Sequence, residues 1–171
     1  MPPKERQLEE EGDLEMLFSR LNRSLYQSSA YQRTFVCFIM GSLDLRTRRF
    51  QLINGGVPYP LYYRAARNSI VELELDAYPL GASLDSRYPT ADLQLETGDY
   101  LVFCSDGIME SASTTGEIFG YERTANVVHR CCARALGADA LIGELFAAVQ
   151  RFAAGEPQED DMTCMVLRVE A

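Results

Sequence analysis

The segment YLVFCSDG, residues 100–107, is the part of the chain that decides the fold. Its first five residues form an unbroken apolar run, which is typical of a β-strand buried on both faces. Ser105, Asp106 and Gly107 end the run abruptly, and Asp-Gly is a common turn dipeptide. The segment predicts a core strand that delivers a carboxylate to the edge of a sheet, with room beside Gly107 for water or a metal ion.

A second apolar strand is predicted next to another set of carboxylates. Glu159, Asp160 and Asp161 come directly before the apolar run at 162–169. Strand ends hold side chains on a rigid scaffold at the loops, where functional residues concentrate. Carboxylates from two such ends can converge on one hard cation, because Mg²⁺ and Mn²⁺ prefer oxygen ligands. The residues alone leave two interpretations open, a divalent metal site and a pair of solvated turns.

The hydrophobic periodicity of the rest of the chain predicts helices and strands without an internal repeat. Helices are expected at 13–28, 121–135 and 138–153, and strands at 34–43, 50–54, 61–64, 69–75, 92–96, 100–104 and 162–169. The strand at 34–43 is apolar on both faces, so we expect it to be buried on both sides. Residues 105–120 are predicted to form a long polar loop.

The order of these elements shows no regular β-α-β alternation. It favours an α+β domain in which helices pack on an antiparallel sheet. A chain of 171 residues is long enough for one substantial core. We therefore expect a flexible lead over residues 1–12 and a single domain over residues 13–171.

Composition excludes several classes of partner. The formal net charge of −9 repels phosphate backbones, so nucleic-acid binding through a basic face is excluded. The five cysteines form no C-x-x-C pair, and Cys37, Cys104 and Cys164 lie in apolar runs, where they are expected to pack as small hydrophobic residues. The polar start lacks a signal-peptide core, and no apolar stretch has the length of a membrane span. We expect a cytoplasmic protein with no membrane partner.

Nine short motifs follow one another from residue 21 to residue 163. They are LNRSLY at 21–26, TFVCF at 34–38, GSLD at 41–44, NGGVP at 54–58, PLG at 79–81, LETGD at 95–99, SDGIME at 105–110, FG at 119–120 and QEDDMT at 158–163. In this order they resemble the metal-dependent protein serine/threonine phosphatases of the type 2C class. The similarity is greatest to the bacterial SpoIIE- and RsbU-like branch, and it extends from about residue 21 to residue 168.

The resemblance implies a fold, a reaction and a set of ligands. The family fold is an antiparallel β-sandwich flanked by helices, in four layers of the α-β-β-α type, with two Mn²⁺ or Mg²⁺ ions at one edge. Family members hydrolyse phosphoserine and phosphothreonine on partner proteins with a metal-activated water. By resemblance, Asp106 and Asp160 are metal ligands, Asp161 orients the site, and Ser105 and Gly107 shape the turn. In this branch the phosphoprotein is often an anti-sigma-factor antagonist.

The sequence departs from the family pattern at two places. The family's first motif, Asp-x-x-Gly-His-Gly, belongs upstream of the helix expected at 13–28 with further strands and a helix, and this chain contains no Gly-His-Gly. Val57 stands where relatives usually carry histidine. The chain is either a truncated phosphatase domain or a degenerate relative that binds a phosphoprotein or another partner without catalysis. A metal-stabilised structural domain is a third interpretation, and an unpaired sheet edge would favour a homodimer.

Overall fold

The structure is a computed structural model that describes residues 14–28 and 35–170. The expected flexible lead, the helix start at residue 13 and the first residue of the strand expected at 34–43 lie outside the described residues. The chain divides into two compact units. The first unit comprises residues 1–41, 52–56 and 75–91, and the second comprises residues 42–51, 57–74 and 92–171.

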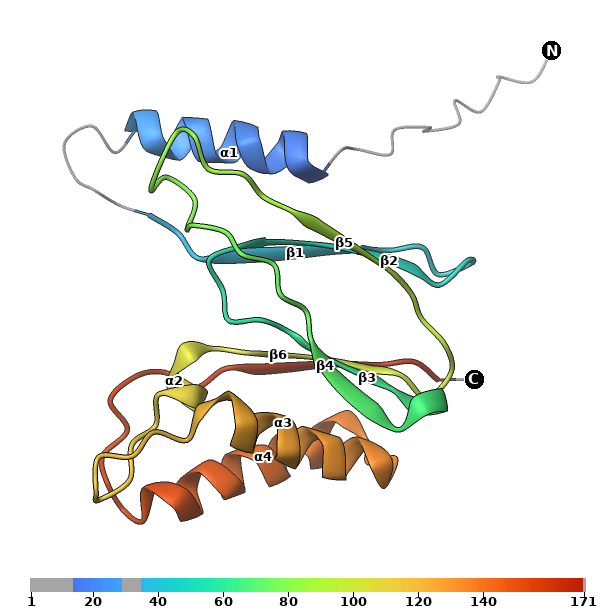
Figure 1. The fold of residues 1–171 in the computed structure, drawn as a ribbon, viewed down its shortest axis with the longest axis vertical. Helices are drawn as coiled ribbons and strands as arrows, with labels where there is room; N and C mark the ends of the chain where they lie inside the picture. Colours follow the sequence, from blue (N-terminus) through green and yellow to red (C-terminus); the bar gives the residue numbers. More distant parts are fainter. Residues whose placement is uncertain (1–13, 29–34, 171) are drawn as a thin grey trace. The chain divides into compact units, whose positions relative to one another are not determined.

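Apart from the short helices α2 and η1, the described elements follow the order that the sequence predicts (Figure 1). They are α1 Leu14–Ser28, β1 Phe38–Leu43, β2 Arg49–Gly55, β3 Leu61–Arg64, the 3-10 helix η1 Ala65–Arg67, β4 Ser69–Glu72, β5 Thr90–Gln94, β6 Tyr100–Cys104, α2 Asp106–Met109, α3 Gly120–Ala133, α4 Ala138–Ala153 and β7 Cys164–Arg168. The strands form a three-stranded sheet in the order β1-β2-β5 and a four-stranded sheet in the order β4-β3-β6-β7.

The four-stranded sheet carries the core of the second unit. Its strands are antiparallel, and β6 lies between β3 and β7 with all five residues buried. The apolar run at 100–104 is therefore a central strand, as its sequence predicts. The last register pair of β6 and β7 joins Cys104 to Cys164, so the segments that follow β6 and precede β7 leave the sheet at the same edge.

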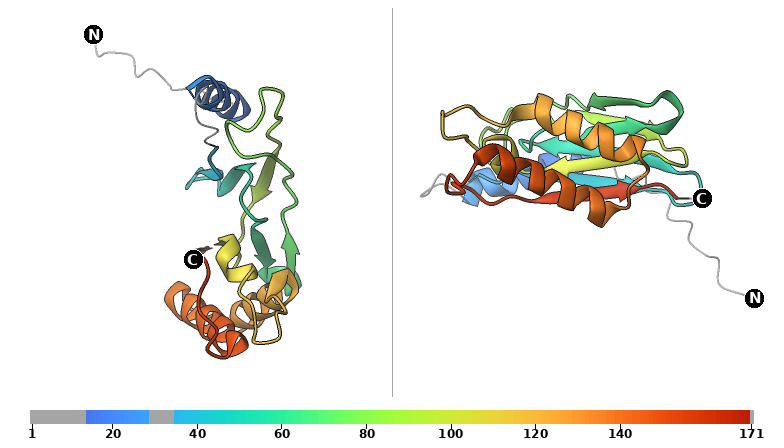
Figure 2. Two further views of the ribbon diagram at one scale, coloured as in Figure 1. Left: turned by 90° about the vertical axis from the view of Figure 1, so that its left-hand side faces the viewer. Right: turned by 90° about the horizontal axis from the view of Figure 1, so that it is seen from below.

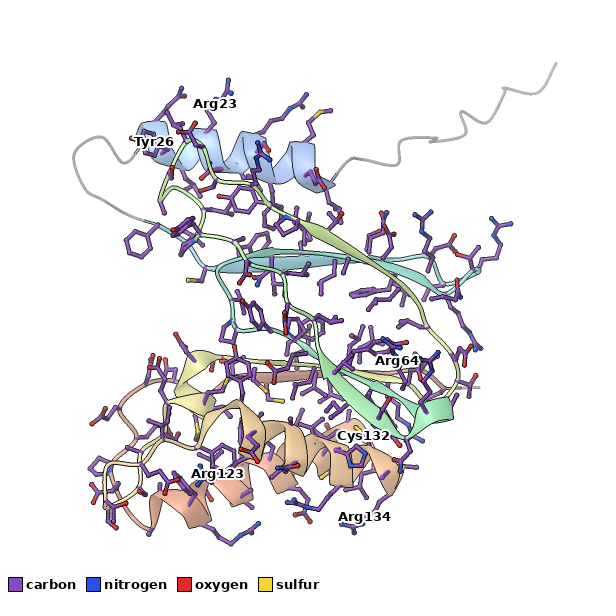
Figure 3. All side chains as sticks on the ribbon, viewed as in Figure 1. Arg23, Tyr26, Arg64, Arg123, Cys132 and Arg134 are labelled. Atoms are coloured by element: carbon purple, nitrogen blue, oxygen red, sulfur yellow. The ribbon has the colours of Figure 1, made fainter. Side chains whose placement is uncertain are left out.

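Helices α3 and α4 cover one face of this sheet and lie side by side (Figure 1 and Figure 2). The apolar stripe of α4 buries Leu141, Leu145 and Val149, and α3 adds Val128 and Cys132 to the same cluster. Cys132 lies on α3 where that helix meets the sheet (Figure 3), and burial raises the pKa of its thiol to about 12.

Gly137 is the N-cap of α4, in line with the helix break expected from the sequence.

The first unit has its own small core beneath α1. Phe18 of α1 is fully buried against Ile53, Leu80 and Tyr88. Asn22, also buried, accepts a hydrogen bond from the Gly81 N–H at 2.7 Å and donates from Nδ2 to the Ser83 carbonyl at 2.8 Å. The amide therefore ties the long connection before β5 to the helix, because both of its polar groups are satisfied by that connection.

The prediction for residues 34–43 is wrong in length and in burial. β1 begins at Phe38, and Val36 forms only an isolated bridge with Leu80. Phe35, Val36 and Phe38 are 58%, 40% and 39% exposed, and Cys37 is exposed as well, so Cys37 is not a buried core residue. β1 is an edge strand of its sheet, and an apolar run neither distinguishes an edge from a centre nor fixes the residue at which a strand begins.

Three further differences concern element ends. The loop expected at 105–120 contains α2 and an isolated bridge between Ala112 and Ile118. β4, β5 and β7 differ from their predicted spans by two residues or more at one end at least, and α3 ends two residues earlier than predicted. The 3-10 helix η1 was not anticipated. Within the described residues, no helix is long and apolar enough to cross a membrane.

One buried carboxylate fixes the turn that leads into β6. Asp99 is 2% exposed and accepts hydrogen bonds from the Tyr62 hydroxyl at 2.8 Å, the Ala65 N–H at 2.9 Å and the Glu96 N–H at 3.0 Å. Burial and the hydrogen bond to Asp99 raise the pKa of the Tyr62 phenol above its usual range, so Tyr62 remains a donor at all ordinary pH values.

Replacing Asp99 with alanine is expected to lower the free energy of unfolding by about 2 kcal/mol, because the buried Tyr62 hydroxyl and two N–H groups lose their acceptor. Chemical denaturation measures the change. Asp92→Ala is the matched control, since the Asp92 carboxylate forms an exposed ion pair with Arg49 and its loss should cost less than about 1 kcal/mol. Equal losses in both variants would contradict the role assigned to Asp99.

Candidate functional site

The ends of β6 and β7 bring the two acidic motifs together. The Ser105 N–H donates to the Thr163 carbonyl at 2.9 Å, which continues the ladder one pair beyond Cys104 and Cys164. The Ser105 hydroxyl donates to the Asp161 carbonyl at 3.0 Å and accepts from the Thr163 N–H at 2.9 Å. A single serine side chain therefore fastens the segment after β6 to the segment before β7, although 56 residues separate Ser105 from Asp161.

Gly107 allows these two segments to approach each other closely. A Cβ atom at position 107 would lie 2.5 Å from the Asp161 carbonyl oxygen, 3.0 Å from its carbon and 3.2 Å from the Asp160 carbonyl oxygen. Real Cβ atoms do not come within 3.0 Å of a backbone atom, so only glycine fits here without a shift. The glycine expected from the sequence to leave space beside Asp106 in fact leaves space for the backbone of the second motif.

Three exposed carboxylates surround this contact. Asp106 is the first residue of the short helix α2, and its Oδ1 accepts a hydrogen bond from the Gly107 N–H at 3.0 Å. Asp160 accepts from the Asp161 N–H at 2.7 Å through Oδ1, and its carbonyl accepts from Gln158 Nε2 at 2.8 Å. Within residues 14–28 and 35–170, no Lys or Arg forms an ion pair with any of the three. Their negative charge is therefore available to a cation.

The donor set fits one hard divalent cation in part. Mg²⁺ commonly takes one or two protein carboxylates and completes its shell with water and phosphate oxygens, and Asp106 and Asp160 are carboxylates of this kind. In the part of the chain that the structure describes, no group of three or more His, Cys, Asp or Glu side chains could hold a metal ion. The described residues thus provide exposed carboxylates on both segments and fall short of a protein cage for two ions.

The Cys104 thiol at the same sheet edge is a packing group. Cys104 is 4% exposed and Cys164 is half-buried across the β6–β7 pair. A hydrogen bond with the Cys164 thiol, together with burial, raises the pKa of Cys104 well above its usual range. Cys104 therefore packs in the core cluster as a small hydrophobic residue, as the sequence predicts.

A groove of about 210 Å³ begins at this site and was not anticipated from the sequence. It contains Gly107 and Asp160 and extends between the segment after α2 and the turn that follows α4. The only sequence signal for it is the Gly155-Glu156-Pro157 turn, which marks a loop without saying what the loop faces.

Replacing Ser105 with alanine is expected to lower the free energy of unfolding by about 1.5 kcal/mol, because the Thr163 N–H loses its acceptor and the Asp161 carbonyl loses a donor. Thermal and chemical denaturation measure the change. Ser113→Ala is the matched control, since the Ser113 hydroxyl bonds only to Thr115 in an exposed loop. If the Ser105 variant were as stable as the Ser113 variant, the result would contradict the claim that the Ser105 side chain holds the two segments together.

Comparison with known proteins shows which family the sequence matches. The sequence model of the family described as Stage II sporulation protein E (SpoIIE) matches residues 5–170. The chain is 26% identical over 152 residues to the phosphoserine phosphatase RsbU of Bacillus subtilis (strain 168), a match that covers 89% of this chain and 44% of RsbU. The chain thus spans less than half the length of that relative.

Solved structures show the same fold. The manganese-presoaked phosphatase domain of the cell fate determinant SpoIIE from Bacillus subtilis superimposes with a TM-score of 0.64 at 21% identity, covering 96% of this chain and 69% of that domain. The SiaA-PP2C domain of Pseudomonas aeruginosa gives a TM-score of 0.68 at 16% identity, over 90% of this chain and 70% of that one. The predicted α+β class with an antiparallel sheet is confirmed.

Proposed function

The chain belongs to the SpoIIE family, and from this premise we propose that it is a protein serine/threonine phosphatase. Its substrates are phosphoserine and phosphothreonine side chains on partner proteins. The resemblance to the SpoIIE- and RsbU-like branch implies an anti-sigma-factor antagonist as the partner. The observation that supports the proposal most is the close contact between Gly107 and the Asp160–Asp161 backbone. It brings the backbone of the second acidic segment against the residue that follows Asp106.

Each residue of the candidate site has a distinct role in this proposal. Asp106 and Asp160 hold Mn²⁺ or Mg²⁺, and Asp161 orients the site beside them. Ser105 and Gly107 keep the two segments in contact, through the hydroxyl bonds and the absent side chain described above. A divalent cation bound here supplies an activated water and neutralises phosphoryl oxygens. The exposure of the carboxylates leaves them accessible to a phosphate on a large partner.

A second candidate function is a non-catalytic module that binds a phosphoprotein or a partner domain. It is favoured by Val57, which stands where relatives usually carry histidine, and by the donor set of the described residues, in which no three side chains could hold a metal ion. In either case we place the protein in the cytoplasm, because all five cysteines are free thiols. A homodimer through an exposed sheet edge is compatible with both functions.

Hydrolysis of a phosphoserine peptide by the whole chain tests the proposal. Phosphate release is measured with Mn²⁺, with Mg²⁺ and with a chelator, and turnover is expected only with a metal. Catalytic turnover in the chelator would contradict the metal role. Absence of turnover in every condition, together with phosphopeptide binding that persists in the chelator, would support the second candidate instead.

Manganese is also expected to raise the melting temperature of the chain, because a ligand that binds only the folded state stabilises it by about 2.7 kcal/mol at a hundred times its Kd. Differential scanning calorimetry with and without Mn²⁺ measures the shift. Calcium serves as a control, since its larger coordination shell suits two carboxylates less well. A melting temperature that Mn²⁺ leaves unchanged would argue against the site, whichever function is correct.

A further inference from the structure

The groove beside the candidate site has an apolar floor. Val149 and Ala153 of α4 and Met162 before β7 line it together with Ala112. Val149 is 2% exposed, and Met162 packs against the same core cluster. The floor is fixed in place because the Ser111 hydroxyl donates to the Gly107 carbonyl at 2.7 Å and lies 3.8 Å from Met162 Sδ. The groove is thus a formed feature of the domain's surface.

The turn that follows α4 builds one wall. Ala154 and Gly155 have positive φ angles of 52° and 95°, and the Glu156 N–H donates to the Ala153 carbonyl at 3.0 Å. Glycine suits position 155 because an L side chain rarely adopts that φ. The reversal of direction brings Glu156 and Pro157 back over the end of α4, where they face the groove.

Every charged side chain that lines the groove is acidic. Glu110 contributes from the α2 side, and Glu156, Glu159 and Asp160 contribute from the segment before β7. No Lys or Arg lies among the lining residues. The C-terminal end of α4 lies at this groove, and the helix dipole adds partial negative charge there. An apolar floor with an acidic rim complements a ligand that carries both aliphatic and basic side chains.

We propose that this groove binds the segment of the phosphoprotein that neighbours the phosphorylated residue, and that it selects segments with basic and aliphatic side chains. The inference rests on the proposed function, because Gly107 and Asp160 belong to both the groove and the candidate site. A polypeptide whose phosphoserine lies at Asp106 and Asp160 therefore has its neighbouring residues at the mouth of the groove. Lys or Arg pairs with the rim, and an aliphatic side chain covers Val149 and Met162.

Two fluorescent peptides test the proposal. They are identical apart from the residues after a phosphoserine, which are Lys-Leu-Lys in one and Glu-Leu-Glu in the other. For the whole chain, kcat/KM is expected to be about tenfold higher for the basic peptide. A tenfold difference equals about 1.4 kcal/mol, which is the size expected from a few partly exposed charge pairs. The preference should shrink at high salt, because exposed charges are screened.

Charge reversal in the groove is compared with charge reversal elsewhere. The variant Glu110→Lys with Glu156→Lys is expected to abolish or invert the preference for the basic peptide. The control Glu74→Lys with Glu144→Lys changes the net charge equally at exposed positions that do not line the groove, and it should retain the preference. Loss of the preference in both variants would assign it to long-range electrostatics and overturn the proposal.

Binding separates this inference from the phosphatase function. Fluorescence anisotropy with unphosphorylated versions of the same peptides does not require turnover. Selective binding of the basic peptide without turnover would support the groove and contradict the phosphatase activity. Turnover without any peptide preference would support the phosphatase activity and overturn the proposed role of the groove. Binding of neither peptide would also overturn the proposed role of the groove.

Discussion

Replacing Gly107 with alanine is expected to lower the free energy of unfolding by about 3 kcal/mol, because the new Cβ would clash with the backbone of the segment before β7. The Asp161 carbonyl oxygen would lie at 2.5 Å and its carbon at 3.0 Å. The clash is relieved only if the segment before β7 moves away from α2. That movement would stretch the hydrogen bonds of Ser105 and displace Asp160 from Asp106.

The same change is expected to reduce phosphatase turnover by about a hundredfold, since misplacement of catalytic groups by about 1 Å has effects of this size. Chemical denaturation and phosphate release measure the two effects on one preparation. Gly143→Ala is the matched control, because nothing lies within 4 Å of a Cβ at this exposed position in α4. There the alanine should stabilise the helix by up to about 1 kcal/mol. A Gly107 variant that unfolds like the wild type would contradict the close contact.

Replacing Asp106 with asparagine is expected to reduce metal-dependent turnover by about a hundred- to a thousandfold, the range seen when one electrostatic contact of a transition state is removed. The amide oxygen can still accept the hydrogen bond from the Gly107 N–H, so α2 keeps its first turn. What is lost is the negative charge that attracts a cation. The variant therefore separates the chemical role of Asp106 from its structural role.

The free energy of unfolding of the Asp106→Asn variant without metal serves as the control. Asp106 is exposed, so the free energy of unfolding in a chelator should change by no more than about 0.5 kcal/mol. Mn²⁺, which should stabilise the wild type, should lose most of its effect on the variant. Asp92→Asn, another exposed carboxylate outside the site, should keep both turnover and the response to Mn²⁺. Full activity of the Asp106 variant would exclude Asp106 as a ligand.

Much of the fold could be predicted because its elements carry strong local signals. The unbroken apolar run at 100–104 is the central strand β6, and the helical period at 138–153 coincides with α4. The prediction of a fully buried strand at 34–43 was wrong for a physical reason. Hydrophobicity reports what a strand can bury, whereas burial depends on its place in the sheet, and β1 lies at an edge. A single strand contains no information about which neighbours will flank it.

The candidate site was predictable in composition but not in detail. Two acidic motifs beside two apolar strands indicate that carboxylates can meet at one edge, and the Cys104–Cys164 register brings their segments together. The approach of Gly107 to the Asp161 carbonyl depends on that register and on α2, which local sequence predicts as loop. The groove depends on the packing of the turn after α4 against the segment after α2, and such long-range contacts leave no periodic pattern.

A double-mutant cycle on Asp106 and Asp160 tests most directly whether the two strand ends form one functional site. Mn²⁺ affinity by isothermal titration calorimetry and phosphoserine-peptide kcat/KM are measured for the wild type, Asp106→Asn, Asp160→Asn and the double variant. If the two carboxylates hold the same cation, each single change removes most of the metal affinity and the turnover, and the double variant is little worse than either single one. Independent, additive effects of the two substitutions, or single variants that bind Mn²⁺ as the wild type does, would contradict a shared site.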